Sequence, residues 1–318
     1  MVFTRKQRSV LRGNAALLIG LAIDPCHVGS EDLGQILAAA HNQFPSTWHT
    51  VLSLPELKVS EVTPRVPHIL HFVHTKTNIL EDKQPEHFHK NILNTIAVYE
   101  ATWNSTAEVH FWTDPDCVKM INQSAPELLV HYQEDPHGPN QSDICRLAAL
   151  DIYGGYYFDN DMVTRKAWEF NDGRCPFASS WAPDRKSGIM QSFIAVIPHQ
   201  PIVQSSFRFM HEHYKRRLPS DPEGMKILLG PRKMKDAYVD LGLGRDNSTF
   251  DEAACMLEEL NLDDHAYRSL YPNVTRQNGS GWGCNFAMHS IAEDEVFFFS
   301  RMVGAGYPAC DYPFAMNV

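Results

Sequence analysis

Two acidic side chains near the middle of the sequence are the residues best suited to chemistry. Asp159 and Asp161 flank Asn160, directly after the aromatic run Tyr156–Phe158. Two carboxylates this close repel each other, and burial strengthens the repulsion. A hard divalent cation relieves it, because Mg²⁺ and Mn²⁺ prefer oxygen ligands and also bind substrate phosphates. The spacing therefore predicts a metal site, although a solvated turn rich in Asp and Asn would use the same residue types.

The residues before this acidic pair predict a helix, a tight turn and a short strand. Ser142 is expected to cap the helix. Its apolar residues recur at helical spacing: Ile144, Leu147, Ala148 and Ile152. Gly154 and Gly155 are expected to end it, because only glycine takes a positive φ without strain. The aromatic run then reads as a buried strand, with the acidic pair at its end.

The whole pattern resembles a known family signature. It consists of Ser142-Asp143-x-x-Arg146, then Leu150, then Gly154-Gly155-x-Tyr157-x-Asp159-x-Asp161. It is similar to the pattern of the DXD-motif sugar transferases, a family that includes the yeast initiating α-1,6-mannosyltransferase, the inositol-phosphoceramide mannosyltransferases and the animal α-1,4-galactosyltransferases. Weaker landmarks extend the resemblance from about Pro64 to His289.

The resemblance implies a fold, a reaction and a cofactor. The fold would be α/β and GT-A-like, a nucleotide-sugar-binding fold with a mixed, mostly parallel sheet flanked by helices. The enzyme would be a retaining hexosyltransferase that depends on Mn²⁺ or Mg²⁺. Its donor would be a UDP-sugar or GDP-mannose, with UDP favoured because the signature fits several UDP-using branches. Its acceptor would be a glycan or glycolipid.

The resemblance also implies roles for the residues of the signature. Asp161 would bind the metal directly, and Asp159 would bind it through water or hold the ribose. Asp143 would accept a hydrogen bond from ribose or base, and Arg146 would pair with a carboxylate or with the donor. Asp143 and Arg146 are one helical turn apart and share a face. An ordinary surface ion pair has the same spacing and contributes only ~0.3–0.5 kcal/mol.

Two flanking residues are further candidates for donor binding. His74 ends the expected strand Val66–His74 and stands where the family has a tryptophan. An imidazole there could stack on the base, or it could be an ordinary histidine at a strand end. Gln191 stands where the family has asparagine, so it keeps an amide for a sugar hydroxyl.

His289 is the candidate third metal ligand. It matches a late histidine of the family, but the Ser-Trp that follows in the family is absent. Glu293 or Glu295 could take part instead. A second acidic pair, Asp114 and Asp116, is expected to begin a helix with Asp114 as its cap rather than to bind metal.

The remaining elements favour a sheet with helices on its faces, because strands and helices alternate. The expected strands are Ala107–Thr113, Phe177–Trp181, Ile189–Ile197 and Phe286–His289. The expected helices are Glu86–Trp103, Pro201–Arg217 and a segment within Asp246–Asn261. Leu229-Gly230-Pro231 resembles the family's Thr-Gly-Pro, which implies a loop near the acceptor. Residues 1–62 are interpreted as a targeting or anchor segment with a stalk, and residues 63–318 as the catalytic domain.

Composition limits the partners. The chain has 318 residues, 43% of them hydrophobic, which suffices for one large core. Its net charge of −10 argues against a nucleic-acid partner. The anionic donor stays compatible with this charge, because a bound metal supplies local positive charge.

The N-terminus and the sequons favour the secretory pathway. Basic residues precede the apolar run Ala15–Ile23, which is shorter than the roughly 20 residues that span a bilayer. It resembles a signal peptide, could associate with a membrane, and could also be a buried helix. Six Asn-x-Ser/Thr sequons suggest a lumenal protein, as in the Golgi: Asn104, Asn122, Asn140, Asn247, Asn273 and Asn278.

Seven cysteines leave at least one without an intramolecular partner. Cys145, inside the predicted central helix, is expected to be a small buried hydrophobe.

Two other functions use the same residues. A metal-dependent phosphohydrolase would also need the acidic pair, but such sites usually gather more His and Asp ligands. A non-catalytic sugar-binding relative would fit the departures at His74, Gln191 and the missing Ser-Trp.

Overall fold

The structure is a computed structural model that describes residues 65–74, 86–170, 173–216, 229–245, 248–261 and 286–300. The predicted targeting segment and stalk, residues 1–62, lie outside this part of the chain.

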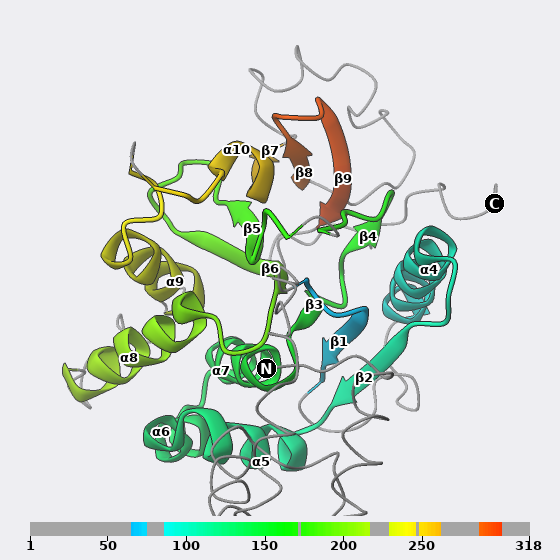
Figure 1. Cartoon of the computed structure of the whole chain (residues 1–318). Helices are drawn as coiled ribbons and strands as arrows, with labels where there is room; N and C mark the ends of the chain where they lie inside the picture. The colour runs from blue at the N-terminus through cyan, green and yellow to red at the C-terminus, as the bar shows by residue number, and fades with distance from the viewer. Residues whose placement is uncertain are drawn as a thin grey trace, which may run out of the picture. The chain divides into compact units, whose positions relative to one another are not determined.

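A nine-stranded mixed sheet organises the described residues, in the order β2-β1-β3-β6-β5-β7-β8-β9-β4 (Figure 1). The strands are β1 Ile69–Val73, β2 Glu108–Trp112, β3 Gly155–Phe158, β4 Val163–Thr164, β5 Phe177–Trp181, β6 Ile189–Val196, β7 Met256–Asn261, β8 Phe286–Ser290 and β9 Glu295–Ser300. The predicted mixed α/β fold is confirmed.

The sheet is not mostly parallel, which corrects one detail of the prediction. Among the described strands, only β1–β2, β1–β3 and β5–β7 pair in parallel, and the other neighbours are antiparallel. Short connections explain the difference. β5 to β6 and β8 to β9 are hairpins, and a hairpin joins antiparallel strands, whereas parallel strands need a long crossover.

Helices cover both faces of the sheet. They are α4 Glu86–Trp103, α5 Asp114–Ser124, α6 Leu129–Glu134, α7 Gly138–Tyr153, α8 Pro201–Arg216, α9 Leu229–Asp240 and α10 Glu252–Cys255. In Figure 1, α4 lies on one side of β1 and β3, and α5 to α9 lie on the other. Two apolar cores follow from this arrangement, one with α5, α7, α8 and α9 and one with α4.

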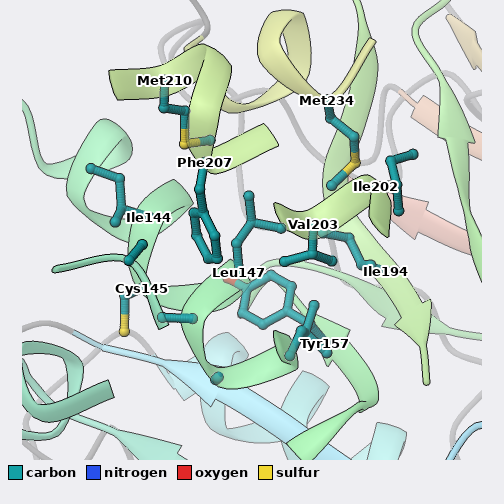
Figure 2. Close-up of a cluster of buried hydrophobic side chains, with 14 of the residues drawn as sticks. Ile144, Cys145, Leu147, Tyr157, Ile194, Ile202, Val203, Phe207, Met210 and Met234 are labelled. Carbon is teal, nitrogen blue, oxygen red and sulfur yellow. The ribbon is translucent and has the colours of Figure 1, made fainter. Parts of the chain in front are cut away.

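Strand β3 is buried on both faces, which places the acidic pair between the two cores. Tyr157 points into the core of α7 and α8, whereas Tyr156 and Phe158 point into the core of α4. Figure 2 shows Leu147 of α7 next to Val203 and the ring of Tyr157.

The central helix begins earlier than predicted. Helix α7 starts at Gly138 with His137 at the N-cap, so Ser142 lies inside the helix and does not cap it. Pro139 occupies the first turn, where its missing N–H is not needed. The glycine turn is confirmed, with φ of 62° at Gly154 and 99° at Gly155. A Cβ on Gly155 would lie 2.6 Å from the carbonyl oxygen of Ile69, so β1 also requires glycine there.

Three other local predictions need correction. Thr113, not Asp114, caps α5, and the Asp116 carboxylate accepts from the Thr113 backbone N–H at 3.3 Å. Leu229–Pro231 is the first turn of α9 rather than a loop. Among the described residues of 246–261, the only helix is the short α10. The residues after it form strand β7, because their apolar side chains pack beside β5 in the sheet.

Cys145 is also more than a buried hydrophobe, since it forms a disulfide with Cys117 that joins α7 to α5. A second disulfide joins Cys175 to Cys255.

Candidate active site

The acidic pair lies at the carboxyl edge of the three parallel strands β2, β1 and β3. Its backbone is held on both sides. The Asp159 N–H donates to the carbonyl of Ser192 in β6 at 2.8 Å. The Asn160 side-chain amide donates to the carbonyl of Val73, at the end of β1, at 3.0 Å. The middle residue of the motif therefore holds the pair beside the strand end that carries His74.

One carboxylate oxygen of Asp159 has two partners. Its Oδ1 lies 3.1 Å from Nη1 of Arg146 and accepts a hydrogen bond from the Tyr157 hydroxyl at 2.6 Å. The guanidinium also lies over the Tyr157 ring, 4.6 Å from its centroid. These contacts fix the orientation of Asp159, whose side chain remains about a third exposed.

Arg146 is the buried cation of the site. It donates to the backbone carbonyl of Gln191 at 2.7 Å and to the Ser142 hydroxyl at 2.9 Å. Its guanidinium also lies 3.5 Å from the carboxylate of Asp143. Burial lowers the pKa of Arg146, but Asp159, Tyr157 and Asp143 together raise it above its usual value. The predicted contact between Asp143 and Arg146 is present, and it is buried rather than on the surface.

Asp143 and Gln191 meet at the first turn of α9. Oδ2 of Asp143 accepts from the Gly230 N–H at 2.9 Å. Burial raises the pKa of Asp143 to about 6, although Arg146 opposes this rise. The Gln191 side chain is only 2% exposed, and both of its amide atoms lack a hydrogen-bond partner among the described residues. A Cβ on Gly230 would collide with the side chains of Gln191 and Asp143, so a larger residue there would displace these two groups.

Glu259 of β7 is a further carboxyl group close to the acidic pair. It is 3% exposed. Burial, and then the carboxylates of Asp159 and Asp161, raise its pKa to about 8. Arg146 is thus a cation that the structure places against Asp143 and Asp159, while Asp161 and Glu259 are further carboxyl groups nearby. Carboxyl oxygens gathered in this way are the kind of ligand that a divalent ion prefers.

His289 lies in β8, 5% exposed, with Nε2 3.2 Å from Oδ1 of Asp294. Glu295 pairs with Lys166 at 2.6 Å, and Glu293 lies 3.8 Å from the same lysine. Among the described residues, no three His, Cys, Asp or Glu side chains are arranged to hold a metal. The third ligand therefore stays a prediction.

His71 of β1 has a structural role. Its Nδ1 accepts from the Trp112 indole N–H at 3.0 Å, so Nε2 is left to donate to the Gly154 carbonyl at 2.7 Å. It is fully buried, and burial lowers its pKa to about 3. His71 ties β1 and β2 to the glycine turn.

Residues 74–181 match the family described as "Glycosyltransferase sugar-binding region containing DXD motif". This matched region contains Asp143, Arg146, Asp159 and Asp161. The chain is a glycosyltransferase. The narrower mannosyltransferase and galactosyltransferase groups named above are not distinguished by this match.

Comparison with solved structures gives distant similarities to transferases. "PaToxG Glycosyltransferase" has 16% identity and a TM-score of 0.36, covering 57% of this chain and 71% of that one. "Structure of Transferase" has 13% identity and a TM-score of 0.33, covering 70% of this chain and 92% of that one. No curated protein matches significantly.

Three groups of this glycosyltransferase were missed by sequence reasoning: the Tyr157 hydroxyl, the Gly230 N–H and Glu259. Tyr157 is part of the signature and could have been assigned a role from its spacing to Asp159. Glu259 had a weaker signal, as one of two adjacent acidic residues between apolar ones in Met256–Leu260. Gly230 had none, because only the packing of α9 brings it to Asp143.

Proposed function

We propose that this enzyme transfers a hexose from a UDP-sugar to a glycan or glycolipid acceptor, with a divalent cation and with retention of configuration, on a GT-A-like domain. The observation that carries the proposal is the place of the acidic pair within the matched region. It lies at a carboxyl edge of the sheet, beside the buried pair of Asp143 and Arg146. Ligands commonly bind at the carboxyl ends of strands in open α/β sheets.

The residues fit a divalent cation. Asp161 is half-buried and would hold the ion together with the donor diphosphate, whereas Arg146 and Tyr157 keep Asp159 oriented for a contact through water or with the ribose. The carboxyl oxygens of Asp159, Asp161 and Glu259 support a dication such as Mn²⁺ or Mg²⁺, which prefers oxygen ligands. When bound, the ion would stabilise the charge on the departing diphosphate. His289 is the proposed third ligand.

Gln191 and Asp143 are proposed to bind the donor sugar or ribose. The amide of Gln191, which has no hydrogen-bond partner among the described residues, is both donor and acceptor, as a sugar hydroxyl is. A buried amide without partners is costly, and a ligand hydroxyl would remove that cost. His74, at the end of β1, would contact the base.

Retention is proposed to proceed on one face of the sugar, with the leaving phosphate taking the acceptor's proton. Arg146 and Asp143 would orient the donor, and no carboxylate of the chain would bond to the sugar. A glycosyl-enzyme adduct trapped by a slow substrate and located by peptide mass spectrometry would contradict this mechanism.

A lumenal location, as in the Golgi, is supported by the disulfides Cys117–Cys145 and Cys175–Cys255, since disulfides persist mainly in oxidising compartments. Among the described residues, no helix is long and apolar enough to cross a bilayer. The proposed N-terminal targeting segment lies outside them.

Thermal unfolding with UDP or GDP, each with and without Mn²⁺, tests the proposal. A ligand that binds only the native state at a hundredfold excess over Kd stabilises it by about 2.7 kcal/mol. A Mn²⁺-dependent shift with UDP that is lost in Asp161→Asn is expected. A shift with GDP instead would reassign the donor. No shift with either nucleotide would favour a non-catalytic sugar-binding relative. Asp114→Asn is the control, because Asp114 belongs to the other acidic pair. If this variant also lost the UDP shift, the loss in Asp161→Asn would not be specific to Asp161.

A further inference from the structure

Two of the six sequons in the sequence have sharply different surroundings in the fold. We propose that Asn104 carries an N-linked glycan and that Asn140 does not. The inference rests on the secretory location within the proposed function. The acceptor tripeptides are Asn104-Ser105-Thr106 and Asn140-Gln141-Ser142.

Asn104 lies in the exposed turn between α4 and β2. All three residues of its sequon are exposed, and so are Ala101 and Thr102 in the preceding helical turn. A glycan at this turn would extend into solvent without displacing the core. The backbone of Asn104 has φ of 49°, a left-handed conformation that asparagine tolerates better than most residues. The left-handed turn accounts for an asparagine at position 104. It does not account for Thr106, which completes the acceptor tripeptide.

Asn140 is buried in the first turns of α7 and is 3% exposed. Its side-chain nitrogen, the atom that a glycan would modify, donates to Oδ2 of Asp135 at 3.1 Å. The same carboxylate oxygen accepts from the Tyr214 hydroxyl at 2.8 Å. The sequon hydroxyl of Ser142 accepts from Arg146 in the active site. A glycan on Asn140 would break this buried network, so the folded enzyme requires an unmodified amide.

The place of Asn104 also separates the glycan from catalysis. Strands β1, β2 and β3 run parallel. Asn104 precedes β2, whereas Asp159 follows β3, so the two residues lie at opposite ends of these parallel strands. A five-residue strand such as β2 spans roughly 17 Å at about 3.3 Å per residue. A glycan at Asn104 therefore leaves the donor site open.

The modification is an ordinary group transfer. The side-chain nitrogen of Asn104 bonds to the anomeric carbon of a lipid-linked oligosaccharide and loses one proton. The bond from that carbon to the lipid diphosphate breaks, and the diphosphate leaves with the electron pair. No oxidation or reduction takes place.

Peptide mass spectrometry of the full chain, expressed in eukaryotic cells, tests the inference. A glycan on the Asn104 peptide and an unmodified Asn140 peptide are expected. Thr106→Ala should remove the first glycan, and Thr106→Ser, which keeps the sequon, should retain it. Asn104→Asp removes the acceptor amide and keeps a residue that tolerates the left-handed turn. Removing the glycan enzymatically should leave kcat and KM unchanged.

An unmodified Asn104 peptide in the wild-type chain would overturn the inference, and so would a glycan on Asn140 in active enzyme. Mn²⁺-dependent UDP binding, measured on the same preparation, reports separately on the proposed catalytic function. Failure of the glycan inference with intact UDP binding is therefore distinguishable from failure of the transferase mechanism.

Discussion

Asp159 and Asp161 have the same chemistry but different surroundings. Arg146 and the Tyr157 hydroxyl both engage one oxygen of Asp159, so its charge is partly balanced within the protein. Asp161 is half-buried and lies within the turn that follows β3. The fixed orientation of Asp159 supports the proposed contact through water or with the ribose, with Asp161 as the proposed direct ligand of the ion.

Tyr157→Phe should lower kcat/KM roughly tenfold. A hydrogen bond to a charged group contributes about 1.5 kcal/mol or more, and about 1.4 kcal/mol corresponds to a factor of ten. The measurement is sugar transfer at several Mn²⁺ concentrations. Tyr156→Phe is the matched control, because it removes a hydroxyl on the opposite face of the same strand. Equal losses in both variants would mean that the contact with Asp159 is unimportant.

Glu259 predicts a pH dependence of stability in metal-free enzyme. Its folded pKa of about 8 lies above its ordinary value of 4.5, so between these values the folded state binds more protons than the unfolded state. Stability should therefore fall as pH rises from about 5 to 8. Urea unfolding in the presence of a chelator measures this slope. Glu259→Gln should flatten it, whereas Glu127→Gln, at an exposed position, should not. An unchanged slope in Glu259→Gln would contradict the prediction.

At the scale of elements, helix α7 positions the site because three neighbours hold it. Cys145 bonds to Cys117 of α5, Leu147 packs against α8 and β3 (Figure 2), and Asp143 accepts from the first turn of α9. His71 then holds the turn from α7 into β3. Asp143, Arg146 and the acidic pair are therefore placed by one helix–turn–strand unit.

Replacing both cysteines of a disulfide by alanine should lower the free energy of unfolding by an amount set by the length of the loop that the disulfide closes. The sequence separations are 28 for Cys117–Cys145 and 80 for Cys175–Cys255. Chain entropy then predicts losses of about 3.5 and about 4.5 kcal/mol. Chemical unfolding of the two double variants measures both. A larger loss for the shorter loop would show that the α5–α7 contact, rather than loop entropy, dominates.

At the scale of the whole molecule, the matched region is incomplete as a folding unit. Residues 74–181 include α7 and β3, but β1 ends at Val73 and β6 begins at Ile189. Both neighbours of β3 in the sheet therefore lie outside the region. Gln191, Gly230 and Glu259 also come from outside it, so the site is assembled from most of the described chain.

A fragment of residues 74–181 should consequently fail to unfold cooperatively. It would expose the apolar faces of β3 and α7, which the intact chain covers with β1, β6 and α8. Urea titration followed by circular dichroism, with the full chain as control, measures this. A sharp transition would show that the region folds alone, if the dependence of its unfolding free energy on urea concentration has the slope expected for its size.

The sequence by itself determined the central helix, the glycine turn and the acidic strand end, because these depend on local spacing and on positive φ at Gly154 and Gly155. It also indicated the glycosyltransferase family, through a signature within one continuous stretch. Only the tertiary structure decided that Cys145 is cross-linked, that Asp143 meets Gly230, and that Glu259 approaches the acidic pair. These contacts join residues far apart in the chain. Whether they form depends on sheet order and helix packing, which no local pattern encodes.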